Sequence, residues 1–231
     1  MAIFSGPEIP NNGLVLNLDA ANPRSYLGSG PTWTDLSGLG NNGTLTNGPT
    51  YSSTNNGSIV FDRVDDYVNI TNSSSLQVTN NLTIVVWFMP YNYGVGRQGL
   101  LGKNGLSEYT ITLEPSGSIS HYFNSANQPG SYYNNASSRA FGQTNNIFQQ
   151  LCITRNFADL VLIYKNGIIT SYSTSLVGVT PPSATTGAVT IGTGNGGNFL
   201  GRVGLFQLYN RALSQAEIQQ NFEAKRGRYG I

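Results

Sequence analysis

Leu82-Thr83-Ile84-Val85-Val86-Trp87-Phe88-Met89 is the most continuous apolar strand candidate in this sequence. A run of this length, rich in β-branched and aromatic residues, is typical of a strand that lies centrally in a sheet and is covered on both faces. The sequence therefore predicts a central β-strand over 82–89.

Shorter apolar or alternating runs lie on both sides of this segment, and Asn-Gly pairs separate many of them. Residues 109–113 and 118–123 predict one hairpin. Residues 160–164 and 168–172 predict another, with Asn166-Gly167 as a type I′ turn. Many short strands with frequent turn signals indicate a sandwich or a barrel. We expect an inner face that includes Leu16, Leu18, Val60, Ile84, Val86, Ile111, Ile153, Leu162 and Leu208.

One helix is predicted near the C-terminus. Ser214-Gln215-Ala216-Glu217 forms a capping box, and Ile218 and Phe222 lie one turn apart on an apolar face. Lys225 and Arg226 suit the last turn, which Gly227 can end. The fold class is therefore all-β, a two-sheet antiparallel sandwich with one short C-terminal helix.

Composition narrows the class of function. Only 10% of the residues are charged and the net charge is +1, so we expect no nucleic-acid partner. We also expect no membrane insertion, because no run approaches the length of a spanning segment, and the N-terminus lacks the features of a secretory signal. We expect an N-terminal arm at 1–12 and one domain at 13–231. The arm and the tail at 225–231 are both candidates for docking on a neighbouring subunit.

Several motifs, in this order, are similar to those of laminin G-like, concanavalin A-like lectin domains. They are Gly13–Asn22, Trp33–Gly38, Asn41–Leu45, Phe61–Val68, Leu82–Trp87, Tyr164–Gly167 and Tyr209–Ile218. The chain resembles in particular the stand-alone versions found in virion proteins of bacteriophages. The resemblance covers about residues 13 to 222 and implies a jelly-roll fold. It is much less specific for function, because one fold hosts many functions.

The resemblance implies a non-enzymatic virion surface protein, either a capsid decoration or a fibre or tail component. Its expected partners are other virion subunits, in a homo-oligomer, and a host surface glycan. Its expected location is the surface of the virion. The alternatives are a carbohydrate-binding lectin or adhesin and a cellular adhesion module.

Acidic residues crowd into one loop at Asp62, Asp65 and Asp66. Crowded carboxylates repel one another unless a counter-charge neutralises them, and calcium binds such oxygens. One interpretation is a calcium site that includes Asp19; the other is that the aspartates cap turn amides beside Arg63. Compared with the family pattern, Arg63 stands where glycine is usual. Gly204 stands where an acidic residue often occurs, which weakens the case for calcium.

Catalytic groups are sparse. The resemblance includes glucanases, which carry paired glutamates on one strand. In this chain Glu108 and Glu114 are six residues apart in the sequence, with no acidic residue between them. His121 is the only histidine, and Cys152, the only cysteine, reads as a buried thiol in a strand. We therefore expect no catalytic residues and no enzymatic activity. The Gly-rich run at 192–197 lacks the Lys-Ser/Thr of a phosphate loop and predicts a connection between strands.

Aromatic residues beside asparagines suggest a glycan-binding surface. Tyr91 and Tyr93 follow the central strand, and Tyr132, Tyr133 and Asn134 lie in a polar loop. Exposed rings stack on sugars while amides bond to hydroxyl groups. The alternative is that these rings pack at strand ends or at a subunit interface. Trp33 and Trp87 are expected to be buried.

Overall fold

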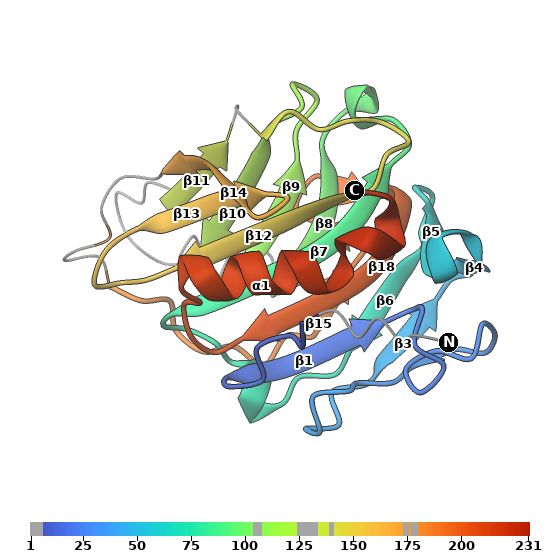
Figure 1. The fold of residues 1–231 in the computed structure, drawn as a ribbon, viewed down its shortest axis with the longest axis horizontal. Coiled ribbons are helices and arrows are strands. Elements are labelled where there is room, and N and C mark those ends of the chain that lie inside the picture. The colour runs from blue at the N-terminus through green and yellow to red at the C-terminus, as the bar shows by residue number, and fades with distance from the viewer. Residues whose placement is uncertain (1–6, 104–107, 124–133, 139–140, 173–175, 177–179) are drawn as a thin grey trace.

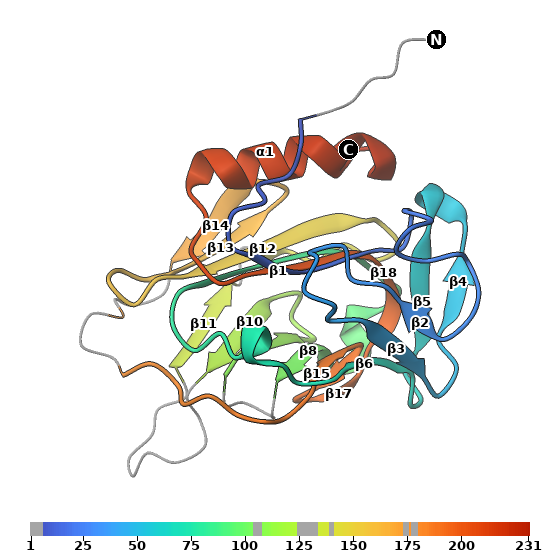
Figure 2. The ribbon, with the colours of Figure 1, turned by 90° about the horizontal axis from the view of Figure 1, so that it is seen from below.

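The computed structural model describes residues 7–103, 108–123, 134–138, 141–172, 176 and 180–231. Two large antiparallel sheets face each other, and one helix lies outside them (Figures 1 and 2). The predicted fold class is confirmed. None of the helices in these described ranges is long and apolar enough to cross a membrane.

The first sheet, sheet A, has eight strands in the order β14-β13-β12-β7-β18-β5-β4, with β1 also paired to β18. The predicted central strand is β7, which lies between β12 and β18. The long β18 pairs with β5 through its first half and with β1 through its second half. The strands are β1 (Leu14–Asp19), β4 (Thr50–Ser52), β5 (Ser58–Asp62), β7 (Leu82–Pro90), β12 (Gln149–Arg155), β13 (Val161–Lys165), β14 (Ile168–Tyr172) and β18 (Leu200–Tyr209).

The second sheet, sheet B, has eight strands in the order β11-β10-β9-β8-β15-β6-β3-β2. They are β2 (Thr32–Trp33), β3 (Gly43–Thr46), β6 (Tyr67–Ile70), β8 (Gln98–Lys103), β9 (Thr110–Leu113), β10 (Ile119–Phe123), β11 (Asn134–Ser138) and β15 (Val189–Ile191). The Gly-rich run connects β15 to β18, as predicted, but it also forms a small hairpin of β16 (Thr193–Gly194) and β17 (Gly197–Asn198). Single 3₁₀ turns lie at Thr54–Asn56, Ser74–Leu76, Tyr93–Val95 and Gly227–Tyr229.

Both predicted hairpins are present. β9 pairs with β10, and β13 pairs with β14. In the second hairpin, Asn166 and Gly167 have φ of 51° and 75°. Positive φ at both central residues is what a type I′ turn requires, so the Asn-Gly pair sets this connection.

The main core lies between the sheets and contains Trp33 and seven of the nine predicted inner-face residues. Val60 and Leu162 were assigned to the wrong face. Ile59 and Phe61 point into the core in place of Val60, and Val161 and Ile163 do so in place of Leu162. Leu162 packs instead in the apolar cluster on the outer face of sheet A.

The helix α1 (Gln215–Arg226) covers that outer face, as Figure 2 shows. Ser214 caps it as predicted: its hydroxyl accepts from the Glu217 amide, and the Glu217 carboxylate accepts from the Ser214 amide. Trp87 is fully buried, but beneath α1 rather than between the sheets. Both faces of β7 are therefore covered, which explains its continuous apolar sequence.

The C-terminal tail packs against the chain's own sheet A, and its docking on a neighbouring subunit stays a prediction. Residues 227–229 continue α1 as a 3₁₀ turn, and Gly230 takes the left-handed conformation at φ 73°. Tyr229 is buried against Trp87, and Arg228 pairs with Asp19 at 2.5 Å. The tail is part of the packing of sheet A.

Candidate functional site

Three loops meet at one end of the sandwich, and we call the surface they form the tyrosine rim. They are residues 62–66, from the last residue of β5 to the start of β6, residues 91–97 between β7 and β8, and the turn 114–117 between β9 and β10. A Cβ on Gly96 would lie 3.1 Å from Nη2 of Arg63, which joins the first two loops. A Cβ on Gly117 would lie 3.6 Å from the ring of Tyr93, which joins the second and third.

The tyrosine rim brings together the acidic loop and two of the predicted glycan-binding tyrosines, which the sequence left as separate sites. Tyr91 and Tyr93 are both half-buried, and their loop is anchored to neighbouring elements. The Tyr91 amide donates to the Leu200 carbonyl at 3.1 Å, and Leu200 pairs with Asp62. The predicted tyrosines and aspartates are thus neighbours through the first residue of β18.

Each tyrosine is held in place. The Tyr91 hydroxyl accepts from Nε of Arg202 at 2.7 Å, and the guanidinium lies 5.7 Å from the centre of its ring. The Tyr93 amide donates to Oδ1 of Asn145 at 3.1 Å. A ring that is fixed like that of Tyr91 loses little conformational entropy when a ligand binds, whereas the Asn145 contact holds the backbone of Tyr93.

Arg97 and Glu114 form a salt bridge at the tyrosine rim. Nε of Arg97 lies 3.0 Å from Oε2 of Glu114, and the Arg97 side chain is 43% exposed. This hydrogen bond to Glu114 raises the pKa of Arg97. Oε1 of Glu114 also accepts from the Thr112 hydroxyl at 3.0 Å, so Glu114 positions the guanidinium rather than standing free.

The acidic loop gathers Asp62, Asp65 and Asp66, whose carboxylate oxygens lie within 4.8 Å of one another. Oδ1 of Asp62 accepts from the Val64 amide at 2.7 Å, and Oδ2 of Asp66 accepts from the Asp62 amide at 3.1 Å. Arg63 takes φ 73° where the related pattern has glycine. Burial raises the pKa of Asp66, and the neighbouring Asp62 and Asp65 carboxylates act in the same direction.

These contacts test the fit of calcium. Three carboxylates at this spacing supply the oxygen ligands that calcium takes, but two of the oxygens already bond to turn amides. Asp19 is not part of the cluster. Its carboxylate lies 2.5 Å from Arg228 and 3.3 Å from Lys225. The turn interpretation therefore explains Asp62 and Asp66, and the fourth predicted ligand has another role.

The other predicted glycan-binding residues are described only in part. Tyr132 and Tyr133 lie outside the described residues. Asn134 begins β11 at the edge of sheet B, where its backbone pairs with Phe123.

The residues considered for catalysis are placed apart and in structural roles. Glu108 is fully buried beside Lys103, whereas Glu114 bonds to Arg97. Burial raises the pKa of the Cys152 thiol and lowers the pKa of His121 to about 3, with Arg155 as the second cause for His121. Nδ1 of His121 contacts the Thr110 carbonyl at 3.1 Å, which fits a neutral ring that donates from Nδ1.

Sequence reasoning missed the arginines of the tyrosine rim. Arg97 and Arg202 reach Glu114 and Tyr91 across 17 and 111 residues of sequence. No local spacing signals such contacts. An arginine in a polar loop next to two tyrosines was the only available clue for Arg97.

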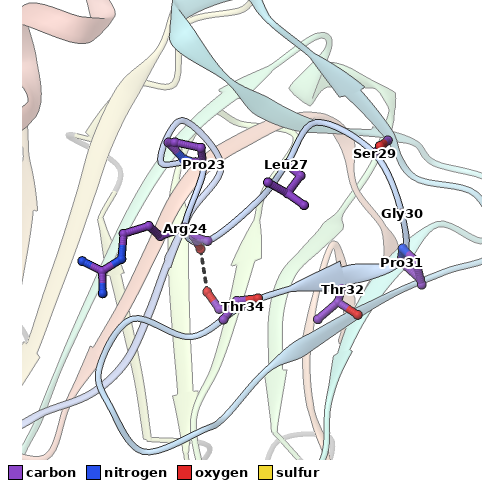
Figure 3. Close-up of a pocket in the computed structure, with 9 residues that line it drawn as sticks. Pro23, Arg24, Leu27, Ser29, Gly30, Pro31, Thr32 and Thr34 are labelled. Carbon is purple, nitrogen blue, oxygen red and sulfur yellow. Dashed lines mark hydrogen bonds between the residues drawn. The ribbon is translucent and has the colours of Figure 1, made fainter.

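An open pocket of about 360 Å³ lies near β2 (Figure 3). Its lining includes Leu27, which is 83% exposed, and the Ser25 hydroxyl donates to the Thr34 carbonyl at 2.6 Å. The sequence did not single out this pocket. Its lining residues are Pro23, Arg24, Ser25, Leu27, Ser29, Gly30, Pro31, Thr32 and Thr34.

Comparison with known proteins identifies the family. A laminin G family model, described as the concanavalin A-like lectin/glucanases superfamily, matches residues 62–219. A search of curated proteins finds no match.

Solved structures share the fold at low identity. The receptor-binding domain of a botulinum neurotoxin C/D mosaic serotype has a TM-score of 0.74 at 12% identity, covering 94% of this chain and 52% of that one. The binding domain of Paraclostridial Mosquitocidal Protein 1 has a TM-score of 0.73 at 17% identity, covering 92% and 52%. The botulinum neurotoxin serotype D ligand-binding domain, solved with N-acetylneuraminic acid, has a TM-score of 0.71 at 11% identity, covering 93% and 52%. The chain thus spans about half the length of these structures.

Proposed function

Because this chain belongs to the concanavalin A-like lectin/glucanases superfamily, we propose that it is a non-enzymatic, lectin-like protein that binds a glycan at the tyrosine rim. The observation that carries the proposal is the meeting of Tyr91, Tyr93 and Arg97 at one end of the sandwich. Rings offer flat apolar surfaces to the faces of a sugar. Guanidinium and amide groups bond to its hydroxyl and carboxylate oxygens.

The absence of enzymatic activity is supported by the roles that the acidic groups already have. Glycoside hydrolysis needs two carboxyl groups on opposite sides of one sugar-binding site. Among the described residues, Glu108 is buried against Thr185, and Glu114 is bonded to Arg97 and Thr112. Neither faces a second carboxylate across an open site.

The finer proposal is that the protein lies on the surface of a bacteriophage virion, as a capsid decoration or a fibre or tail component. Its support is the resemblance of the motifs at 13–222 to stand-alone phage domains. The proposed partners are other subunits of the virion, in a homo-oligomer, together with a host surface glycan. A free lectin or adhesin is the alternative, and its glycan would be bound at the same rim.

The N-terminal arm, residues 1–12, is the proposed attachment to a neighbouring subunit. Proline limits the conformations of the unbound arm and so lowers the cost of ordering it. Within the described part, the Glu8 carbonyl accepts from Nε2 of Gln220 on α1 at 2.6 Å. Deletion of residues 2–10 should abolish attachment and leave the fold intact. Attachment that survives the deletion would refute this role for the arm.

Two measurements test the function. A glycan array should show binding of a defined sugar class, and it should include sialylated glycans because one similar toxin domain was solved with N-acetylneuraminic acid. Mass spectrometry of purified particles from the source should detect the protein. Absence from particles together with tight glycan binding would favour the free lectin, and no binding on the array would contradict the rim proposal.

A further inference from the structure

Lys103 and Asn72 approach each other across one strand of sheet B. Lys103 is the last residue of β8, and Asn72 follows β6 by two residues. β15 lies between these strands, and its first residue, Val189, pairs with both Lys103 and Ile70. The two side chains therefore meet beside the start of β15, although 31 residues separate them in the sequence.

The amine of Lys103 is enclosed. Its side chain has no exposed surface, and Nζ lies 2.5 Å from Oδ1 of Asn72. The Gly187 carbonyl lies 2.6 Å from the same nitrogen, and the Thr185 carbonyl lies 3.4 Å away. The contact with Oδ1 places the amine beside the carboxamide group of Asn72, whose carbon Cγ is bonded to that oxygen.

A buried carboxyl group completes the cluster. Oε1 of Glu108 lies 3.9 Å from Nζ of Lys103 and accepts from the amide and the hydroxyl of Thr185 at 2.6 and 2.5 Å. Oε2 is also buried and has no hydrogen-bond partner among the residues that the structure describes. A buried oxygen without a partner is costly and calls for an explanation. Here Thr185 fixes one oxygen of the carboxyl group and leaves the other available for a proton.

Burial lowers the pKa of Lys103, although the charge of Glu108 acts in the opposite direction. A lower pKa increases the fraction of neutral amine, which is the nucleophilic form. Neither the proposed glycan site nor the packing of the core uses this group. The buried amine of Lys103, the buried carboxyl group of Glu108 and the half-buried carboxamide of Asn72 are thus held together, and the group has no assigned role.

We propose that Lys103 and Asn72 join spontaneously in an isopeptide bond, and that Glu108 carries the proton. Nζ of neutral Lys103 attacks Cγ of Asn72, and the Glu108 carboxylate accepts the proton that the amine loses. Glu108 then donates a proton to the carboxamide nitrogen as the bond from Cγ to Nδ2 breaks. The products are an amide between the two side chains and one molecule of ammonia, and no oxidant or cofactor takes part.

The bond would link β8 to the end of β6 across β15. It would close a loop between residues 72 and 103 in a chain whose only cysteine, Cys152, cannot form an internal disulfide. A covalent link of this kind stabilises a fold by restricting the unfolded chain. This inference does not depend on the proposed glycan binding, because the cluster lies within sheet B, apart from the three loops of the rim.

Intact-mass spectrometry of the denatured full chain tests the proposal without any variant. The expected mass is lower than the sequence mass by one ammonia, after allowance for the initiator methionine. Digestion should then give a branched peptide that joins the segments containing residues 72 and 103. Succinimide formation at an Asn-Gly pair also releases ammonia, so the branched peptide is the decisive product. A wild-type chain at the full sequence mass, or one that gives only unbranched peptides, overturns the proposal.

Variants assign the roles. Lys103→Arg keeps a positive charge but lacks the amine nucleophile, and Glu108→Gln keeps the shape of the side chain but cannot carry the proton. Both should have the full mass expected from their sequences. Lys165→Arg is the matched control: Nζ of Lys165 lies 2.6 Å from the Gly142 carbonyl, and this variant should keep the branched peptide. A branched peptide in Glu108→Gln would refute the role of Glu108.

Discussion

Tyr229 stacks on Trp87, with ring centroids 4.2 Å apart and planes inclined by 13°. Trp87 belongs to the central strand β7, and Tyr229 lies in the 3₁₀ turn that follows α1. Phe222 also stacks on Trp87 at 5.7 Å, and Phe148 contacts Tyr229 at 4.6 Å. The end of the chain therefore covers the outer face of sheet A, where an uncovered Trp87 would expose a large apolar surface.

Tyr229→Ala should lower the free energy of unfolding by about 3 kcal/mol, because the change removes a buried ring and leaves a cavity over Trp87. Urea unfolding monitored by tryptophan fluorescence measures the effect. Tyr51→Ala, a change at a half-buried tyrosine, is the comparison and should cost less. Equal losses in the two variants would contradict the role of the tail.

Gly204 makes room for this contact, because a Cβ there would collide with the hydroxyl of Tyr229. Gly204→Ala should cost about 2 kcal/mol through overcrowding. The loss should be smaller in a Tyr229→Phe background, which lacks the hydroxyl. A double-mutant cycle on urea unfolding gives the coupling, and additive losses would show that the two residues do not interact. Packing against Tyr229 thus explains why this chain has Gly204 at the position where related sequences often carry an acidic residue.

His121 should make stability depend on pH. Burial lowers its pKa to about 3 from 6.5, so the folded state holds the neutral ring while the unfolded chain binds a proton below pH 6.5. The stabilising contribution is complete above pH 6.5 and decreases as pH falls, by about 1.4 kcal/mol per pH unit. Between pH 6.5 and 5 the wild type should lose about 2 kcal/mol.

His121→Phe should remove this slope, because His121 is the only histidine in the chain. The free energy of unfolding is measured in urea at several pH values in that window. A wild-type slope that persists in His121→Phe would assign the pH dependence to other groups. The absolute stability of the variant is a separate quantity, since the contact between Nδ1 and the Thr110 carbonyl is also lost.

Arg155 ties β12 to the segment before β7. Its guanidinium is buried and donates to the carbonyl groups of Val78, Thr79, Asn80 and Glu108 at 2.7 to 3.1 Å. Arg155→Lys should lower the free energy of unfolding by about 3 kcal/mol. The planar guanidinium donates to four carbonyl groups at once, and the single ammonium group of lysine cannot reach all of them. Thermal unfolding compares it with Arg24→Lys, an exposed change that should have almost no effect. If Arg155→Lys loses as little thermal stability as Arg24→Lys, the carbonyl contacts of Arg155 do not stabilise the fold as we expect.

The features that could be predicted from sequence are those set by local chemistry. Ser214 and Glu217 lie within one helical turn, and Asn166-Gly167 determines its own turn, so both were found correctly. The inner faces of β5 and β13 were not, because both strands carry apolar residues at consecutive positions. At β13, Leu162 packs in the apolar cluster on the outer face that α1 covers, so apolar and polar residues do not alternate and the sequence no longer shows which side faces the core.

The candidate site could be predicted only in pieces. Asp62, Asp65 and Asp66 are close in sequence, as are Tyr91 and Tyr93, and each group was recognised. Their meeting at one rim depends on strand order, since β5 and β7 both pair with β18. The same is true of Asp19, whose pairing with Arg228 spans 209 residues and could not be read from either segment alone.

Calcium at the acidic loop remains a proposal with a direct test. Asp62, Asp65 and Asp66 repel one another, so a bound cation should raise the unfolding midpoint of the wild type relative to a sample with chelator. Asp65→Asn should be more stable than the wild type in chelator and should gain less from calcium. If neither calcium nor chelator changes the unfolding midpoint, the metal interpretation is wrong, and the aspartates serve only to bond the turn amides.

Glycan binding should depend on Tyr93 and Arg97. Tyr93→Ala removes a ring that lies beside the turn at Gly117 and leaves the backbone contact to Asn145 unchanged, and Arg97→Ala removes an exposed guanidinium. Each change should weaken binding by roughly tenfold or more, which corresponds to about 1.4 kcal/mol. Calorimetry with a sugar identified on the array measures the affinity, and thermal unfolding shows whether the variant is folded. Tyr51→Ala is the matched control, because Tyr51 lies in β4 and packs against Tyr26, outside the three loops of the rim, so this variant should bind like the wild type. Equal affinity of Tyr93→Ala and the wild type would place the glycan elsewhere, with the pocket near Leu27 as the next surface to test.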